Sequence, residues 1–357
     1  MKRSEQEVLH ATMVRWKPTM TSDLMEPMPP PRPSQGEDES RLAWARYWQA
    51  GALHSCATSF SGNYDGPIAD FWRSVFAPLS PGDRVLDVAS GNGALARMLI
   101  DTRTEASITC DSVDLAPVTP AWLSALPPGQ AARVRFFGSM HAEALPFTEG
   151  TYALAISQFG LEYTDLDRSV PELLRVLRRP ATFAAVIHHI GSRPLQMAAE
   201  ELRHIAWALQ PDGLMARASR MLEPMARAAT EAGRRSLATD AGALDAREQF
   251  NACQRELSDI ASRSPCPDIL YELREAIATV ISTATARGEQ VARTALQGVG
   301  QAVADNRARL TDMGRAAMDE PKLQSLLLRL GPSTAQRVVR LDHSGHLMGW
   351  AVQVTLA

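Results

Sequence analysis

The chain has 357 residues, of which 45% are hydrophobic, and a formal net charge of -3. It can therefore bury a large core in one or two domains, while the small negative charge argues against a nucleic-acid partner. With no apolar run long enough to span a membrane and four scattered cysteines without a Cys-x-x-Cys pair, we expect a cytoplasmic protein with reduced thiols and no metal site.

Residues 1–40 are predicted to form a disordered tail. They are polar and rich in proline, with PMPPPRP at residues 27–33 followed by QGEDES. Such a segment buries too little apolar surface to offset the conformational entropy that it would lose on folding.

Residues 41–80 carry many of the aromatic side chains of the chain. Trp44 and Trp48 are spaced as on one helix, and Trp72 lies in a second stretch with the same period. We expect two helices that pack on the rest of the fold and cover the site. Tyr64, in the glycine-flanked loop between them, is the ring expected at the pocket.

Strands and helices alternate after Pro81. We predict strands at residues 84–89, 107–113, 132–137, 152–157 and 182–188. Alternating units of this length form a parallel sheet with helices on both faces, and such sheets bind ligands at the carboxyl ends of the strands.

Residues 195–330 interrupt this alternation. The segment is rich in alanine, leucine and arginine at helical spacing, and we predict five to seven helices, with breaks at Pro211, Pro224 and Gly288 among others. Residues 337–357 then form two β-rich runs around a His-Ser-Gly turn, which predicts a terminal hairpin. We therefore expect a core formed by residues 81–194 and 331–357. The helical insertion serves as a lid, an acceptor pocket or a surface for homodimerisation.

A glycine-rich turn follows the first predicted strand in RVLDVASGNG, residues 84–93. Gly91, Gly93 and Ala96 fit the spacing of a dinucleotide site. However, Asp87 would face the pyrophosphate of a dinucleotide, whereas its carboxylate suits a cofactor with a cationic end. Asp114, at the end of the second strand, can accept hydrogen bonds from both hydroxyls of a ribose.

Five segments in order resemble the class I S-adenosylmethionine-dependent methyltransferases. They are RVLDVASGNG, CDSVDLAP, FFGSMHAEALPF, YALAISQFGLEY and LLRVLRRPATFAAVIHH. The resemblance covers residues 82–190 and the terminal hairpin. It implies a Rossmann-like α/β fold whose seven-stranded, mostly parallel sheet ends in an antiparallel hairpin, with the helical insertion before the last two strands. It also implies S-adenosylmethionine as the cofactor.

The resemblance further implies which residues bind the cofactor. Asp87 and the glycines would hold the methionine end, and Asp114 would hold the ribose. His141 stands where the family often has an aspartate that accepts the adenine amino group. With Tyr64 added from its loop, the expected cofactor-binding set is Tyr64, Asp87, Ala89, Gly91, Gly93, Asp114, Leu115, His141, Ala142, Glu143, Ser157, Gln158 and Phe159.

Methyl transfer from a sulfonium is an in-line displacement that depends on alignment and exclusion of water. A base is needed only where the acceptor must lose a proton. Glu162, after the fourth strand, and His188 and His189, at the end of the fifth, are the candidate catalytic residues. Adjacent residues of a strand point to opposite faces, so at most one of the two histidines can face the site.

We predict an S-adenosylmethionine-dependent methyltransferase with a small-molecule acceptor. The segment SQFG at residues 157–160 lacks the Asn/Asp-Pro-Pro-Tyr motif and the cysteine that mark methyltransferases of nucleic-acid bases. Three alternatives stay open: a catalytically degenerate binding or assembly protein of the same fold, a protein methyltransferase, and a nicotinamide-dependent oxidoreductase, which Asp87 disfavours.

Overall fold

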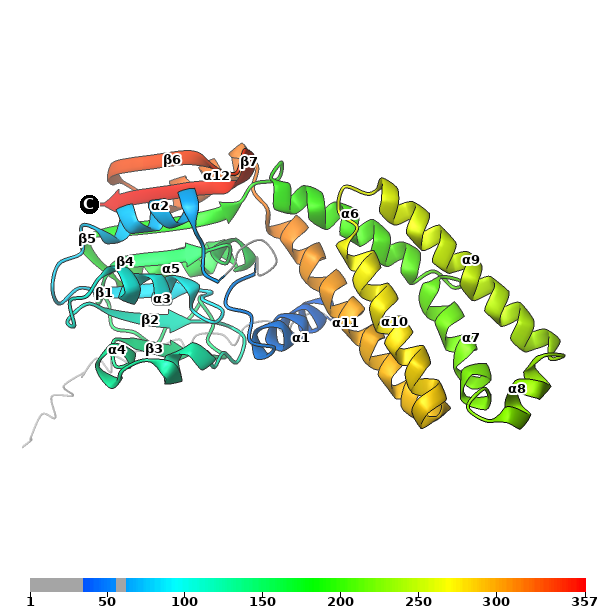
Figure 1. Cartoon of the computed structure of the whole chain (residues 1–357). Helices are drawn as coiled ribbons and strands as arrows, with labels where there is room; N and C mark the ends of the chain where they lie inside the picture. Colours follow the sequence, from blue (N-terminus) through cyan, green and yellow to red (C-terminus); the bar gives the residue numbers. More distant parts are fainter. Residues whose placement is uncertain (1–34, 56–61) are drawn as a thin grey trace, which may run out of the picture.

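The computed structural model describes residues 35–55 and 62–357. It consists of a sheet with helices on both faces and an arm of long helices that projects from one edge of this layered core (Figure 1). Most of the predicted tail lies outside the described residues. Helix α1, Gln35–Gln49, covers the last part of that tail, so the helical region begins earlier than predicted.

The sheet has seven strands in the order β3-β2-β1-β4-β5-β7-β6. Strands β1 to β5 pair in parallel, whereas β7 pairs antiparallel with both β5 and β6. This confirms the predicted fold class. Ser344 and Gly345 both have positive φ, which closes the terminal hairpin with the twist that adjacent strands require. The strands are Arg84–Val88, Thr109–Val113, Val134–Phe137, Tyr152–Gln158, Leu177–His188, Ser333–His343 and His346–Leu356.

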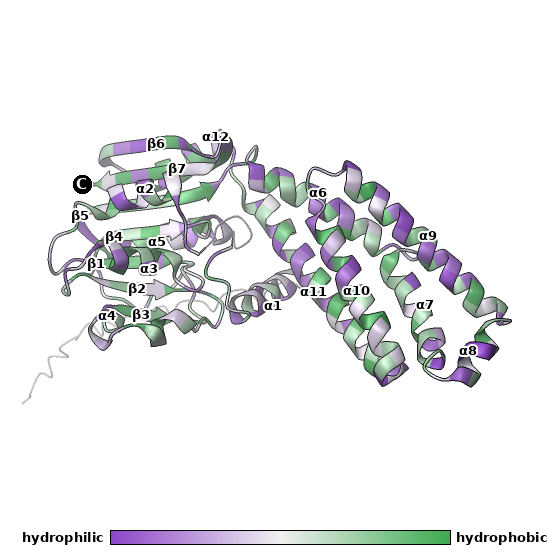
Figure 2. Ribbon diagram, in the orientation of Figure 1, coloured by the Kyte–Doolittle hydropathy of each residue, from purple (hydrophilic) through white to green (hydrophobic). Residues whose placement is uncertain are grey.

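One apolar layer covers each face of the sheet. Helices α2, Gly66–Phe76, and α3, Ala94–Thr102, pack on one face, with Trp72 and Phe76 fully buried. Helices α5, Leu166–Val176, and α12, Glu320–Leu330, cover the other. The middle strands are therefore buried on both sides, and Figure 2 shows them largely hydrophobic. Two short helices complete the layers, the 3-10 helix Ala121–Ala125 and α4, Pro128–Ala131.

Helix α12 belongs to this layered core and not to the arm. It was expected within the helical insertion, but Leu326 and Leu330 are buried in the same cluster as Phe183 of β5. The chain leaves the sheet after β5 and returns to it at Met318, whose backbone N–H donates to the carbonyl oxygen of His188 at 2.8 Å. The two ends of the arm therefore meet at one point.

The arm has its own apolar core. Its helices are α6 Arg193–Ala208, α7 Leu214–Arg227, α8 Glu231–Leu237, α9 Ala241–Arg263, α10 Asp268–Arg287 and α11 Glu289–Ala316. The predicted break at Pro224 is wrong, because α7 continues through this residue. Proline removes only one N–H donor from the helix, and the carbonyl of Pro224 still accepts from Ala228.

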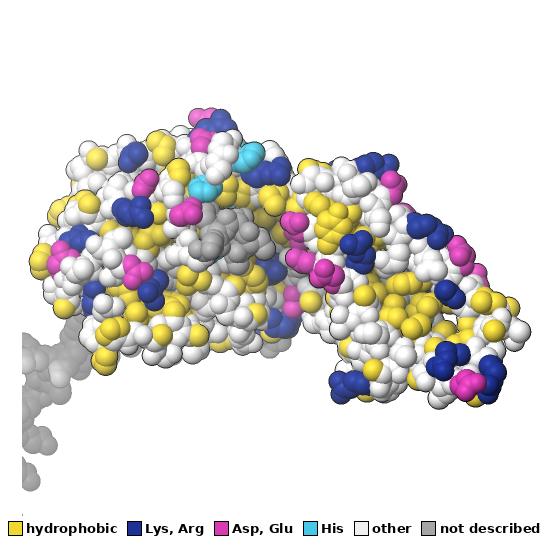
Figure 3. All heavy atoms as spheres, in the orientation of Figure 1, with side chains coloured by type: hydrophobic (Ala, Val, Ile, Leu, Met, Phe, Trp, Pro, Cys, Tyr) yellow, Lys and Arg dark blue, Asp and Glu magenta, His cyan; other side chains and the backbone are white. Residues whose placement is uncertain are grey.

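A hollow of about 580 Å³ lies between α7, α9 and α10 of the arm, lined by Met225, Phe250 and Ile281 among others. Hydrophobic side chains gather over this part of the arm in Figure 3.

The assignment of α12 to the layered core predicts different effects for two leucines of this one helix. Leu326 is fully buried and Leu328 is 81% exposed. Leu326→Ala should lower the free energy of unfolding by about 2–5 kcal/mol because it leaves a cavity, and Leu328→Ala should change it by less than about 0.5 kcal/mol. Urea unfolding measures both. Equal losses in the two variants would contradict this packing.

Candidate active site

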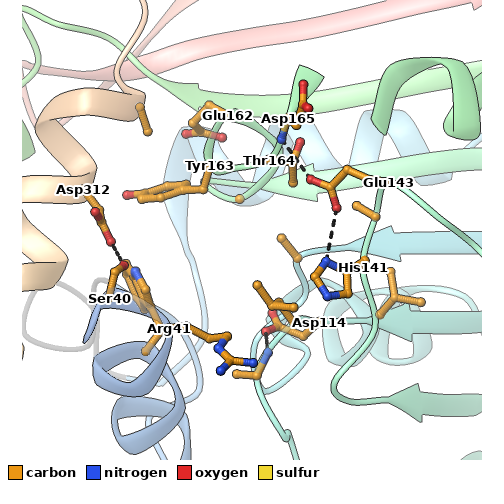
Figure 4. A pocket seen from close by; sticks show the side chains of 18 of the residues that line it. Ser40, Arg41, Asp114, His141, Glu143, Glu162, Tyr163, Thr164, Asp165 and Asp312 are labelled. Atoms are coloured by element: carbon orange, nitrogen blue, oxygen red, sulfur yellow. Dashed lines mark hydrogen bonds and ion pairs between the residues drawn. The ribbon is translucent and has the colours of Figure 1, made fainter. Parts of the chain in front are cut away.

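A cavity of about 550 Å³ opens at the carboxyl ends of β1, β2 and β4, between the sheet and the arm. Figure 4 shows His141 and Glu143, from the loop after β3, on one side, and Ser40 with Asp312 across from them. The cavity is closed by α1 and by the last turn of α11. A much smaller cavity, of about 30 Å³, lies beside it, and Ala89 and Phe159 line both.

The smaller cavity contains unsatisfied polar groups. Asp87 and Gln158 line it together with Tyr64. Oδ2 of Asp87 and Nε2 of Gln158 are buried and have no hydrogen-bond partner among the described residues. The amide oxygen of Gln158 accepts from the indole N–H of Trp72 at 2.5 Å, which fixes the amide. One buried acceptor and one buried donor thus face a space without protein partners, which is an arrangement suited to a small charged ligand.

Asp114 lies in the wall of the larger cavity. Its Oδ2 accepts from the backbone N–H of Gly91 at 2.7 Å and its Oδ1 from that of Ala116 at 2.8 Å. Each oxygen keeps a further lone pair, so the carboxylate can still accept hydrogen bonds from a bound ligand.

Burial raises the pKa of both carboxyl groups. For Asp114 burial raises the pKa to about 6, against the opposing effect of its backbone hydrogen bonds from Ala116 and Gly91. For Asp87 burial, followed by the nearby charge of Asp114, raises the pKa well above its usual value, and the backbone N–H of Ala96 only partly offsets this. A cationic ligand would favour the charged form of Asp87.

The two glycines of the turn, Gly91 and Gly93, allow aromatic rings to pack closely against the backbone. At Gly91 a Cβ would lie 2.6 Å from the ring of Trp48, and at Gly93 it would lie 2.4 Å from Phe136. Both residues also have positive φ, so a larger side chain would be strained. Neither lines a cavity, and the N–H of Gly91 is used by Asp114. Their place is therefore behind the wall of the site.

The predicted adenine residues lie together on one wall of the larger cavity. Leu115, His141, Ala142 and Glu143 all line it. Leu115 is 40% exposed, which leaves its side chain available to a flat ligand. Nδ1 of His141 lies 3.8 Å from Glu143, whose other oxygen accepts from the backbone N–H of Asp165. The ring of His141 is thus held near the ligand space.

The candidate catalytic residues separate into two groups. Glu162 lines the larger cavity and is paired with His188, which is buried behind it. His189 lines neither cavity. Its ring packs on Trp350 with centroids 4.6 Å apart, and its Nδ1 accepts from the backbone N–H of Gly191. The structure thus removes His189 from the site, as the alternation of side chains along a strand predicts for one of two adjacent histidines.

Ser157 does not line the site either. Its hydroxyl donates to the carbonyl of Val88 and accepts from the N–H of Leu161. It therefore joins the ends of β1 and β4, while Gln158 and Phe159 reach the ligand space.

The prediction from the sequence did not include several residues that reach the site from distant parts of the chain. Trp44 and Trp48 of α1 line both cavities, whereas Tyr64 was the ring expected at the pocket. Their spacing of four residues places both rings on one face of a helix, and this pattern could have indicated that both reach the site. Asp312 and Arg315 of α11 also line the larger cavity, and nothing in their local sequence indicated this.

Helix α1 joins the two parts of the molecule. Arg309 of α11 lies over the ring of Tyr47 at 4.2 Å and over that of Trp44 at 5.6 Å. Arg46 forms a bidentate ion pair with Asp305 at 2.5 Å. On its opposite side, the carbonyl of Trp48 accepts from Asn92 in the glycine turn.

The sheet order, the glycine turn and the two carboxylates agree with the comparison against protein families. A family model described as "Methyltransferase domain" matches residues 86–185. This part of the chain is a class I methyltransferase domain. The resemblance inferred from the five sequence segments is thereby confirmed.

Curated relatives match within the same region. The ubiquinone/menaquinone biosynthesis C-methyltransferase UbiE of Xylella fastidiosa (strain M12) is 34% identical over 113 residues, which are 30% of this chain and 44% of that protein. UbiE of Stenotrophomonas maltophilia (strain K279a) is 36% identical over 115 residues, with the same two shares. The chain thus spans less than half the length of these relatives.

Among solved structures, the methyltransferase domain is similar to geranyl diphosphate C-methyltransferase from Streptomyces coelicolor A3(2). The identity is 17%, the TM-score is 0.32, and the match covers 44% of this chain and 65% of that one.

Two kinds of feature are absent from the described residues. They contain no group of three or more His, Cys, Asp or Glu side chains placed to hold a metal ion. They also include no helix with the length and apolarity that a membrane crossing requires.

The burial of Asp87 predicts how stability depends on pH. Its pKa in the folded protein lies above the unfolded value of 3.8. The folded state therefore binds more protons, and its stability falls as the pH rises from about 4 through the raised pKa. Asp87→Asn removes this contribution. Urea unfolding at pH 5 and pH 8 should show a smaller loss of stability in this variant than in the wild type.

The exposed Asp101 of α3 provides the matched control, since Asp101→Asn should leave the difference between the two pH values unchanged. A loss of stability in Asp87→Asn as large as in the wild type would show that Asp87 is not a buried carboxyl with a raised pKa.

Proposed function

We propose that the chain binds S-adenosylmethionine in the two joined cavities and transfers its methyl group to a small molecule. The observation that carries this proposal is the buried Oδ2 of Asp87, an acceptor without a protein partner in a cavity that continues past Asp114. S-adenosylmethionine supplies an electrophilic methyl group on a cationic sulfur, and its methionine end carries an ammonium.

The cavity residues fit the cofactor from end to end. Asp87 would accept from the ammonium, and Nε2 of Gln158 is a free donor for the neighbouring carboxylate. Asp114 would accept from the ribose hydroxyls, with Leu115 and Ala142 against the adenine. Ala89 and Phe159 line both cavities, so the sulfur would lie between them.

The methionine end can enter only if α1 adjusts. The smaller cavity has about the volume of one water molecule, and the ring of Trp48 lies directly over Gly91. Displacement of this ring would open the cavity toward Asp87. Cofactor binding is thereby linked to the helix that also contacts α11.

The acceptor would occupy the rest of the larger cavity, against Tyr163 and the last turn of α11. Two observations favour a small molecule. The cavity is bounded on one side by the sheet and on the other by the arm, and the curated relatives are named for methylation in ubiquinone and menaquinone biosynthesis. On this proposal the arm supplies a wall of the acceptor pocket.

Calorimetry with S-adenosylhomocysteine tests the proposal. The wild type should bind, and Asp114→Ala should weaken binding by about 1–3 kcal/mol because buried hydrogen bonds are lost. Asp101→Ala replaces an exposed residue of α3 and should have no effect on binding. Circular dichroism checks the fold of Asp114→Ala, since Asp114 also holds the backbone N–H groups of Gly91 and Ala116.

Absence of binding by the wild type at millimolar ligand would overturn the proposed function and favour a degenerate binding or assembly protein. Binding of a nicotinamide dinucleotide instead would favour the oxidoreductase. Equal affinity in the wild type and Asp114→Ala would refute the ribose contact alone.

A further inference from the structure

Glu162 and His188 form a buried pair behind the wall of the larger cavity. Glu162 follows β4 and His188 ends β5, and their side chains are 0% and 3% exposed. Oε1 of Glu162 accepts from the backbone N–H of His188 at 2.9 Å and lies 2.8 Å from its Nδ1. A carboxylate only accepts hydrogen bonds, so the Nδ1 atom carries the proton in this contact.

The other oxygen of Glu162 is unused. Oε2 is buried and has no hydrogen-bond partner among the described residues, although Glu162 lines the larger cavity. A carboxylate that served only to hold β4 against β5 would have both oxygens engaged, because an unpaired buried polar atom costs stability. The pair therefore contains a proton acceptor that no described residue engages, and a substrate must displace part of the cavity wall to reach it, because the Glu162 side chain is 0% exposed.

The pair lies next to the point where the two cavities meet. The ring of Phe159, which lines both cavities, packs on the ring of His188 with centroids 4.3 Å apart. Tyr163, also in the wall, contacts the same histidine edge-on at 5.9 Å. His188, the partner of Glu162, thus packs against two aromatic rings beside the position proposed for the sulfur.

We propose that Glu162 is the general base of the methyl transfer and that His188 is the residue that positions it. The proposal rests on the proposed function and specifies its acceptor class, a molecule that must lose a proton from an O–H or an acidic C–H. The proton passes to Oε2 of Glu162, and the freed electron pair forms the bond to the methyl carbon. The electrons of the broken carbon–sulfur bond stay on sulfur, so no further reactant is needed.

Three probe acceptors test the role of Glu162. Phenol supplies an O–H and ethyl acetoacetate an acidic C–H, and both are protonated at neutral pH, whereas iodide is methylated without losing a proton. Glu162→Gln should reduce kcat with the first two by about 10²–10⁴-fold and should leave transfer to iodide within about threefold. Its affinity for S-adenosylhomocysteine in calorimetry should equal that of the wild type, because Glu162 has no part in cofactor binding.

Glu149→Gln is the matched control. Glu149 is exposed in the loop before β4, at the opposite end of the same strand, and this variant should behave as the wild type with every probe.

Two variants test the positioning role of His188. His188→Asn keeps an N–H donor close to the position of Nδ1 and should retain kcat with phenol within about fivefold. His188→Phe keeps the contact with Phe159 but loses the donor, and kcat should fall at least tenfold with little change in KM. Equal losses in both variants would assign His188 to packing alone.

The outcomes separate this inference from the proposed function. If the wild type does not bind S-adenosylhomocysteine, the proposed function is wrong. If the wild type binds S-adenosylhomocysteine but methylates only iodide, or none of the probes, the assignment of Glu162 as general base is wrong. The proposed cofactor site would still stand. Full activity of Glu162→Gln with phenol and ethyl acetoacetate would also overturn the assignment of Glu162 as the base.

Discussion

The site depends on burying two carboxyl groups, Asp87 and Asp114, at the ends of adjacent strands. Both are almost inaccessible to water, and they are supplied with backbone N–H donors, whereas no cationic side chain of residues 35–55 or 62–357 lies within hydrogen-bond reach. Burying a carboxylate without a counter-charge costs free energy. The unliganded protein carries this cost, and a ligand with a positive group would recover part of it. On the proposed function, the ammonium of the cofactor would be this positive group.

Helix α1 explains how the two parts of the molecule form one site. Trp44 and Trp48 reach the cavities, while Tyr47 and Arg46 contact α11. The guanidinium of Arg309 is held by aromatic faces, an interaction that is stronger when water is excluded. A displacement of α1 would therefore alter both cavities together. On the proposed function, cofactor and acceptor binding would then depend on the same helix.

The sheet and half of the site were predictable from the sequence, because both follow from local patterns. Strand periodicity gave the fold class, and Asp87 and Asp114 were found from their positions relative to the glycine turn. The contribution of Asp312 was not predictable, since it lies almost 200 residues from Asp114 and reaches the cavity only through the packing of the arm. The contact between Glu162 and His188 could not be predicted from the sequence either, because it depends on β4 and β5 being neighbours in the sheet.

The chain leaves the layered core and returns to it at one point, although α1 also contacts the arm. The backbone of His188 bonds to that of Met318, so the chain returns to the sheet beside the residue from which it left. A segment with adjacent ends can be lengthened, shortened or exchanged during evolution without changing the order of the strands. On the proposed function, changes in the arm would alter the wall that faces the acceptor while the cofactor site stays the same, which is a simple route to new substrates.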